Sequence, residues 1–91
     1  MNVIKRDGRI QEFDIKKVRT SFQNASDDAK MPFTKSDIDV LVENVEDNLN
    51  KTDIKIISVK EIQEASYNAM IESGFKTVAK FYKSYEGNKL D

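Results

Sequence analysis

Two short runs of β-favouring residues near the N-terminus flank an Asp-Gly dipeptide. The runs are residues 3–6 and 9–13, and the dipeptide is Asp7-Gly8. Runs of this kind joined by Asp-Gly are typical of a β-hairpin in which both turn residues have positive φ. The sequence therefore predicts a hairpin over about residues 2–13. Because a lone hairpin is unstable in water, we expect it to pack on other elements.

Beyond the hairpin, apolar residues recur at helical spacing and predict four helices. Asp14, Thr34 and Ser58 can accept hydrogen bonds from the first turn of a helix, and Thr34 and Ser58 are each followed three residues later by an acid, as in a capping box. Gly74 is suited to end a helix. The predicted helices span about residues 15–25, 35–49, 59–73 and 76–86.

Two segments interrupt the helical spacing and are predicted to be connectors. They are residues 27–33, which include Pro32, and residues 50–57. The fold class that follows is α+β and mostly helical, with an N-terminal β-hairpin packed on a four-helix bundle. At 91 residues the chain has material for one small core and not for two, so we expect a single domain over residues 1–91.

The chain contains no His and no Cys. A zinc ribbon, a Cys or His nucleophile and a disulfide framework are therefore excluded. Hydrophobic residues make up 38% and charged residues 34%, a mixture that fits a folded domain better than a disordered chain or a membrane protein. Because the sequence has no long apolar run and no signal-like N-terminus, we expect a cytoplasmic protein with no membrane partner.

The formal net charge of −1 conceals an uneven distribution along the chain. Residues 1–26 carry a net charge of +3, residues 27–53 carry −5, and residues 54–91 carry +1. This pattern suggests a basic N-terminal part that faces an anion and an acidic second helix that faces solvent or a partner.

Catalysis is not expected from these residue types. Without His or Cys, acid–base work would need carboxylates, Lys or Tyr in a partly dry site, and so small a domain has little interior in which to shift their pKa values. Glu61 and Glu64 lie one turn apart, but capping explains the first and solvent exposure the second. The acidic run of the second helix lacks the spacing of a calcium loop, so we expect no metal site on the protein.

Phosphate binding would have to rely on Lys and Arg, because the sequence has neither a Walker loop nor a Gly-x-Gly-x-x-Gly motif. Lys5 and Arg6 on a predicted strand, with Lys17 on the first helix, would place cations on two neighbouring elements. Taken by itself, this spacing favours ordinary surface cations over an anion site.

Four segments together resemble the ATP-cone, the allosteric nucleotide-binding domain of ribonucleotide reductases and of their transcriptional repressor. They are Val3–Arg9, Phe13–Val18, Ser58–Gln63 and Val78–Tyr85, and they extend the resemblance over nearly the whole chain. The resemblance implies a β-hairpin that caps a four-helix bundle. It also implies binding of ATP or dATP without hydrolysis, with a change of oligomeric state that turns the reductase on or off.

The resemblance implies a nucleotide site built from the hairpin, the first and third helices and the C-terminal end. The cations that match those on the triphosphate are Lys5, Arg6, Lys17 and Lys89. The apolar residues that match those on the adenine are Val3 and Val59, and the polar positions are Gln11, Asp14 and Gln63. Asp14 matches a position near the base or sugar, and we expect that a magnesium ion can bridge the phosphates.

Three positions depart from the commoner family pattern. Gln11 and Gln63 stand where some reductases have Glu and His, so hydrogen bonding can persist without the charge. Glu86 stands where an Arg is frequent, which removes one expected anion contact. Ile57 lies near the implied adenine slot, but we expect it to be a core residue.

The expected function is thus a non-catalytic sensor of ATP and dATP that regulates a ribonucleotide reductase or related partner, with a homo-oligomer possible. Two other classes stay open. One is a small nucleic-acid-binding module that uses the basic hairpin, although the acidic second helix argues against a nucleic-acid partner. The other is a protein-interaction module that has lost nucleotide binding.

Overall fold

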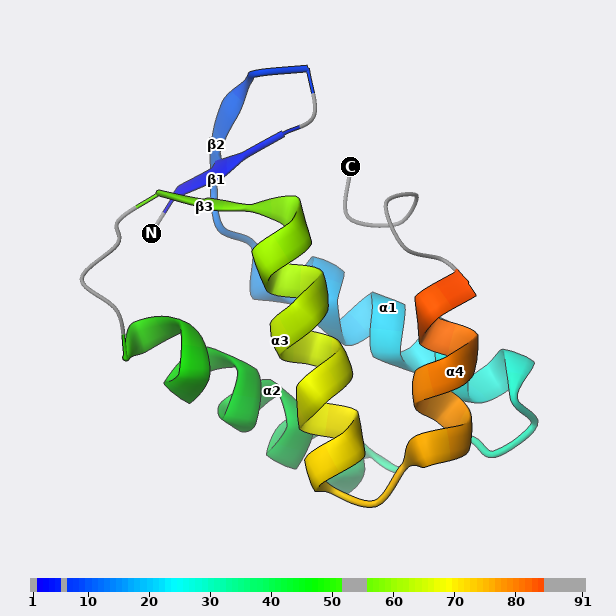
Figure 1. Cartoon of the computed structure of the whole chain (residues 1–91). Coiled ribbons are helices and arrows are strands. Elements are labelled where there is room, and N and C mark those ends of the chain that lie inside the picture. Colours follow the sequence, from blue (N-terminus) through cyan, green and yellow to red (C-terminus); the bar gives the residue numbers. More distant parts are fainter. Residues whose placement is uncertain (1, 6, 52–55, 85–91) are drawn as a thin grey trace.

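The computed structural model describes residues 2–5, 7–51 and 56–84 (Figure 1). In chain order the elements are β1 (Asn2–Ile4), β2 (Ile10–Glu12), α1 (Ile15–Asp28), α2 (Lys35–Asn50), β3 (Ile56–Ser58), α3 (Val59–Glu72) and α4 (Lys76–Ser84). The small sheet lies at one end of the helices, beside the first turns of α1 and α3 (Figure 1). The predicted α+β class, mostly helical with an N-terminal hairpin, is confirmed.

The sheet has three strands in the order β2-β1-β3, so it is larger than the predicted hairpin. β1 pairs with β2 in antiparallel fashion and with β3 in parallel fashion, and Val3 lies between Gln11 and Ile57. The prediction that residues 50–57 form a connector was therefore wrong for Ile56 and Ile57. Three residues give too short a pattern to signal a strand, and the partner of β3 lies at the other end of the sequence.

The hairpin turn also differs from the prediction. The N–H of Gly8 donates to the carbonyl of Lys5 at 3.0 Å, and the N–H of Lys5 donates to the carbonyl of Arg9 at 2.7 Å. Three residues rather than two therefore lie between the last paired positions. Gly8 has φ 89°, whereas Asp7 does not have positive φ. This is the three-residue hairpin loop that ends on a left-handed glycine.

The helix starts follow the predicted caps. Asp14 accepts from the N–H of Lys16 at 3.0 Å, and Ser58 accepts from the N–H of Glu61 at 3.1 Å. Thr34 forms the full reciprocal box that the sequence predicts. Because these side chains satisfy donors that a helix leaves open, each fixes the residue at which its helix begins.

The helix ends agree less well with the sequence. α1 continues to Asp28, three residues beyond the predicted end, and the N–H groups of Lys30 and Met31 close its last turn. The carbonyls of Asp27 and Ser26 accept these bonds. The helix therefore continues through polar residues after its apolar stripe has ended. Gly74 ends α3 with φ 87°, as predicted. The predicted last residues of α4, 85 and 86, lie outside the described part of the chain.

The helices form a bundle in which each helix packs against two others, with α1 diagonal to α3 and α2 diagonal to α4. Both α2 and α4 pack against α1 and against α3, whereas α2 and α4 share no comparable contact with each other. α2 and α4 therefore lie on opposite sides of the α1–α3 pair (Figure 1). Within the described residues, no helix is both long and apolar enough to cross a membrane.

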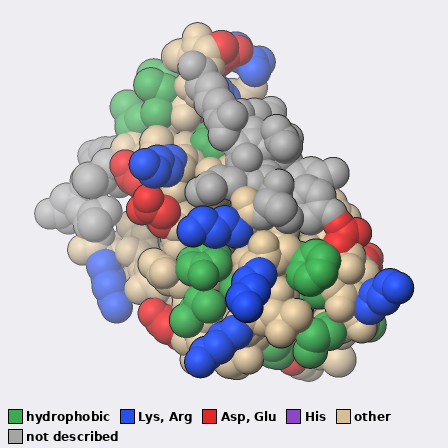
Figure 2. Space-filling model, turned by 45° about the vertical axis from the view of Figure 1, so that its right-hand side comes forward, with side chains coloured by type: hydrophobic (Ala, Val, Ile, Leu, Met, Phe, Trp, Pro, Cys, Tyr) green, Lys and Arg blue, Asp and Glu red, His purple; other side chains and the backbone are tan. Residues whose placement is uncertain are grey.

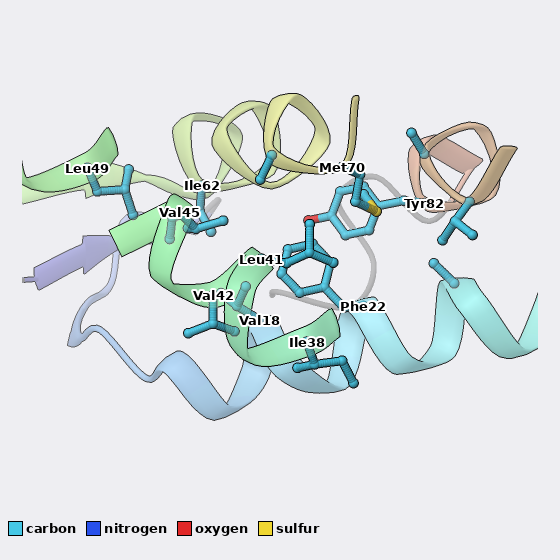
Figure 3. Packing of buried hydrophobic residues seen from close by; sticks show 14 of the residues in the cluster. Val18, Phe22, Ile38, Leu41, Val42, Val45, Leu49, Ile62, Met70 and Tyr82 are labelled. Atoms are coloured by element: carbon cyan, nitrogen blue, oxygen red, sulfur yellow. The ribbon is translucent and has the colours of Figure 1, made fainter. Parts of the chain in front are cut away.

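One hydrophobic core joins the four helices to β1 and β3 (Figure 3). Phe22 of α1 and Tyr82 of α4 lie with their ring centroids 6.0 Å apart, beside Met70 of α3 (Figure 3). Val3 and Ile57 extend this core to the inner face of the sheet, and the expectation that Ile57 is a core residue is confirmed at 1% exposure. The sheet is thus held on the bundle by its inward-facing residues.

Candidate functional site

The inner face of the hairpin carries both an apolar and a charged residue. Val3 is 5% exposed and Lys5 is 8% exposed, whereas Ile4 between them is 39% exposed. Alternation along β1 explains this difference, since successive side chains point to opposite faces of a sheet. Lys is seldom buried in folded proteins, so a lysine on the inner face of a sheet is a candidate functional residue.

Lys5 lines a small depression between the hairpin, the start of α1 and α3, with a volume of about 20 Å³. The residues that line it are Val3, Lys5, Gln11, Glu12, Phe13, Asp14, Lys17, Val18 and Ile62. This volume holds about one water molecule, so the depression is much smaller than a nucleotide.

The first turn of α1 forms one wall of the depression. Asp14 caps the helix, and the N–H of Lys17 donates to the Asp14 carbonyl at 3.1 Å. Lys17 is exposed, and with Lys5 it places two cations on neighbouring elements at this wall. The N-terminus of a helix and nearby cations both favour a negatively charged ligand. Glu12 and Asp14 add two carboxylates to the lining, so the formal charges at the depression balance.

A larger cavity, with a volume of about 290 Å³, lies between α3 and α4. Its lining residues are Gln63, Glu64, Tyr67, Asn68, Tyr82 and Lys83. Gln63 is only 3% exposed, and its Nε2 atom has no hydrogen-bond partner within the described structure. Lys83 places its Nζ atom 5.4 Å from the centre of the Tyr67 ring. The cavity thus combines aromatic walls with a buried amide donor, as small-molecule pockets often do.

The site residues expected from the sequence occupy more than one place. Val3, Lys5, Gln11, Asp14 and Lys17 come together at the depression. Gln63 instead lines the α3–α4 cavity, and Val59 is buried in the core at 4% exposure without lining either cavity. The remaining two, Arg6 and Lys89, lie outside the described residues.

The sequence did not identify several residues that line these two cavities. Glu12, Phe13, Val18 and Ile62 complete the depression, and Tyr67 and Asn68 help to form the α3–α4 cavity. Phe13 and Val18 were part of the family signature, but their apolar character suggested packing alone. No pattern in the sequence marks Tyr67 or Asn68, because their role depends on how α4 lies against α3.

The turn at the tip of the hairpin has its own electrostatic arrangement. Asp7 accepts from the N–H of Arg9 at 3.1 Å and from its guanidinium Nε at 2.6 Å. The backbone N–H of Arg9 first, and its guanidinium second, lower the pKa of the Asp7 carboxyl from its ordinary 3.8. Among the described residues, no three His, Cys, Asp or Glu side chains come together to hold a metal ion.

Comparison with known proteins identifies one family. A sequence model of the ATP cone domain matches residues 1–89. The match covers the sheet, all four helices and both of the cavities described above. No curated protein matches the chain when the sequences are compared.

Proposed function

Because the chain belongs to the ATP-cone family of non-catalytic, nucleotide-binding allosteric regulatory domains, we propose that it senses ATP and dATP. The domain would span residues 1–91 and regulate a ribonucleotide reductase or a related partner by changing an oligomeric state. The observation that carries the proposal is the buried Lys5, which lines the same depression as Lys17 beside the N-terminus of α1.

The phosphates are assigned to this depression. A triphosphate carries several negative charges, and Lys5 and Lys17 would donate charge-assisted hydrogen bonds to its oxygens. The proposal adds Arg6 and Lys89, which lie outside the described residues. The depression holds about 20 Å³, far less than a triphosphate occupies, so the phosphates would lie at its mouth or the lining would have to rearrange.

The base is assigned to α3, between the depression and the α3–α4 cavity that Gln63 lines. Val59 and Gln63 lie one turn apart and therefore on one face of α3. The Gln63 amide would exchange hydrogen bonds with the edge of the adenine, which would give its buried Nε2 donor a partner. Val3 and Val59 would pack on the ring, and Gln11 and Asp14 would contact the base or the sugar.

A magnesium ion enters the proposal only as a ligand of the triphosphate. The described residues contain no metal-binding group of three side chains, although Glu12 and Asp14 lie at the depression. Mg²⁺ commonly retains waters and binds through substrate phosphates, so a protein cage is not required. The proposal also includes a cytoplasmic location, where these nucleotides are made and used, and it includes no nucleic-acid or membrane partner.

A panel of nucleotides tests the proposal directly. The melting temperature of the chain is measured with ATP, dATP, GTP and dGTP at millimolar concentration, each with and without magnesium. A ligand that binds only the folded state raises the melting temperature by mass action. We expect ATP and dATP to raise it more than the guanine nucleotides do. An unchanged melting temperature with all four nucleotides would overturn the proposal.

A further inference from the structure

The outer faces of α2 and α4 carry opposite charges. On α2, the acidic face consists of Glu43, Glu46 and Asp47, all exposed, and no ion pair involves them within the described residues. Asp39, one turn before Glu43 on the same side of α2, pairs with Arg19 of α1 at 2.7 Å, and Asn44 donates to Glu72 of α3. The acidic face is therefore the exposed side of α2 next to this ion pair with α1.

On α4, the basic face consists of Lys76, Lys80 and Lys83, again all exposed. Their spacing of four and three residues places them along one side of the helix. No acidic residue occurs in α4, and no ion pair of the described residues involves these lysines. On the side of the molecule where α4 lies, Figure 2 shows a column of blue side chains flanked by green ones.

Exposed apolar residues also lie on these two helices. Val40 of α2 is 59% exposed, one turn before Glu43, whereas Phe81 of α4 is 40% exposed and lies about 100° around the helix from Lys80, beside the basic face rather than within it. Apolar contact with charges around it is the usual composition of a specific interface, in which the apolar part supplies affinity and the charges supply orientation. The two faces are complementary in charge, with an exposed apolar residue within the face on α2 and beside the face on α4.

We infer that the acidic face of α2 in one copy of the chain docks on the basic face of α4 in a second copy. Because α2 and α4 lie on opposite sides of the α1–α3 pair, one copy cannot present both faces to the same partner. The contact is therefore head to tail. However many copies bind, the assembly keeps one free acidic face at one end and one free basic face at the other. Neither face contains a residue of the depression beneath the hairpin, but Lys83 of the basic face lines the α3–α4 cavity beside Gln63, so the charge reversals below leave Lys83 unchanged.

Sedimentation equilibrium of the whole chain at low and moderate salt is the first test. The Debye length falls from about 30 Å at 0.01 M to about 8 Å at 0.15 M salt, so an electrostatic contact weakens strongly over this range. We expect self-association at 0.01 M salt, a mass that rises beyond the dimer with concentration, and a dissociation constant at least tenfold larger at 0.15 M. A chain that stays monomeric at 0.01 M salt, or a mass that stops at the dimer, would overturn the inference.

Charge reversal supplies the decisive test. The double variant Lys76→Glu with Lys80→Glu makes both faces acidic, and Glu43→Lys with Glu46→Lys makes both faces basic. We expect each variant to be monomeric at 0.01 M salt and an equimolar mixture of the two to associate, because every contact in the mixture again joins opposite charges. Association of either variant by itself, or a mixture that stays monomeric, would contradict the arrangement.

Two controls separate this contact from loss of fold and from a general effect of charge. The reversed positions are exposed, so the melting temperatures by circular dichroism should stay within a few degrees of the parent chain. The variant Lys16→Glu with Lys60→Glu has the same net charge as the α4 variant but alters neither face, and it should still self-associate. If the Lys16 and Lys60 variant were equally monomeric, net charge rather than the two faces would govern association, and the inference would fail.

If the parent chain stays monomeric while a short DNA duplex binds the lysines of α4, the occupant is a nucleic acid and the inference is likewise overturned.

Discussion

The carboxylate of Asp14 accepts a hydrogen bond from the backbone N–H of Lys16 at 3.0 Å, and the same residue lines the depression beneath the hairpin. Asp14 thus begins α1 and also forms part of the candidate site. Because Asp14 has both roles, the stability of the first helix is linked to the geometry of the depression beneath the hairpin. The two roles can be separated by substitution.

Replacing Asp14 should reveal the capping role. Asp14→Ala removes the acceptor for the Lys16 N–H, and we expect a loss of about 1 kcal/mol in the free energy of unfolding. Asp14→Asn keeps an acceptor at the cap and should cost much less. The measurement is urea unfolding followed by circular dichroism. Equal losses for the two variants would show that the carboxylate charge matters more than the cap.

Lys30 is the position where the backbone stores strain. It has φ 56°, and it is the single non-glycine residue with positive φ in the described part of the chain. A side chain in this conformation costs about 1–2 kcal/mol, and glycine avoids most of that cost. We expect Lys30→Gly to raise the free energy of unfolding by about 1 kcal/mol.

Gly74 provides the matched control for Lys30. It has φ 87° after α3, and an added Cβ atom would meet nothing within 4 Å. The cost of Gly74→Ala is therefore purely conformational, and we expect a loss of about 1 kcal/mol. Changes of the same sign in the two variants, measured by urea unfolding, would contradict this account of the helix ends.

Ser26 joins the end of α1 to the segment before α2. It is fully buried, and its Oγ atom accepts from the N–H of Phe33 at 3.2 Å. Ser26→Ala leaves that buried N–H unpaired, so we expect a loss of about 1–3 kcal/mol in unfolding free energy. Ser21 is also buried, but its hydroxyl only donates to the carbonyl of Val18. Ser21→Ala should therefore cost less than about 0.5 kcal/mol, and a larger loss there than at Ser26 would count against this explanation.

Asp7 should contribute to the dependence of stability on pH. Its pKa is lowered in the folded chain, so its contribution is present above its ordinary pKa of 3.8 and is lost as the pH falls through the lower folded value. The backbone N–H of Arg9 is the main cause. We therefore expect Arg9→Gln to retain most of the shift when the Asp7 carboxyl is titrated by NMR. A return to the ordinary value would assign the shift to the guanidinium instead.

The sequence predicted the beginnings of the helices well because those depend on local side chains. Asp14, Thr34 and Ser58 each satisfy N–H groups within the next three residues, so their role can be read from short patterns. β3 could not be predicted in this way. Its pairing with β1 joins Val3 to Ile57, and only the packing of the whole chain brings these residues together.

The candidate site was predictable only in part. The residue pattern by itself favoured ordinary surface cations for Lys5 and Lys17, and the family resemblance suggested the phosphate role. The burial of Lys5 follows from the alternation of β1 over the bundle, which a short strand pattern indicates. By contrast, the α3–α4 cavity depends on how Tyr82 packs against Phe22, and no local pattern encodes that contact.

Nucleotide binding should alter the hairpin more than the rest of the bundle. Lys5 and Gln11 of the hairpin line the depression, so a triphosphate bound there would contact the hairpin directly. We expect saturating ATP to change hydrogen exchange in residues 2–12, while α2 serves as the internal reference. Unchanged exchange in the hairpin of a chain that demonstrably binds ATP would place the nucleotide elsewhere.

Isothermal titration of ATP into the parent chain and three lysine variants tests the central claim most directly. We expect micromolar binding by the parent chain, with Lys5→Ala and Lys17→Ala each weakening it at least tenfold, which is about 1.4 kcal/mol. Lys16→Ala, next to Lys17 but outside the depression, should bind as the parent does. ATP binding that survives both the Lys5 and the Lys17 substitution would contradict the account.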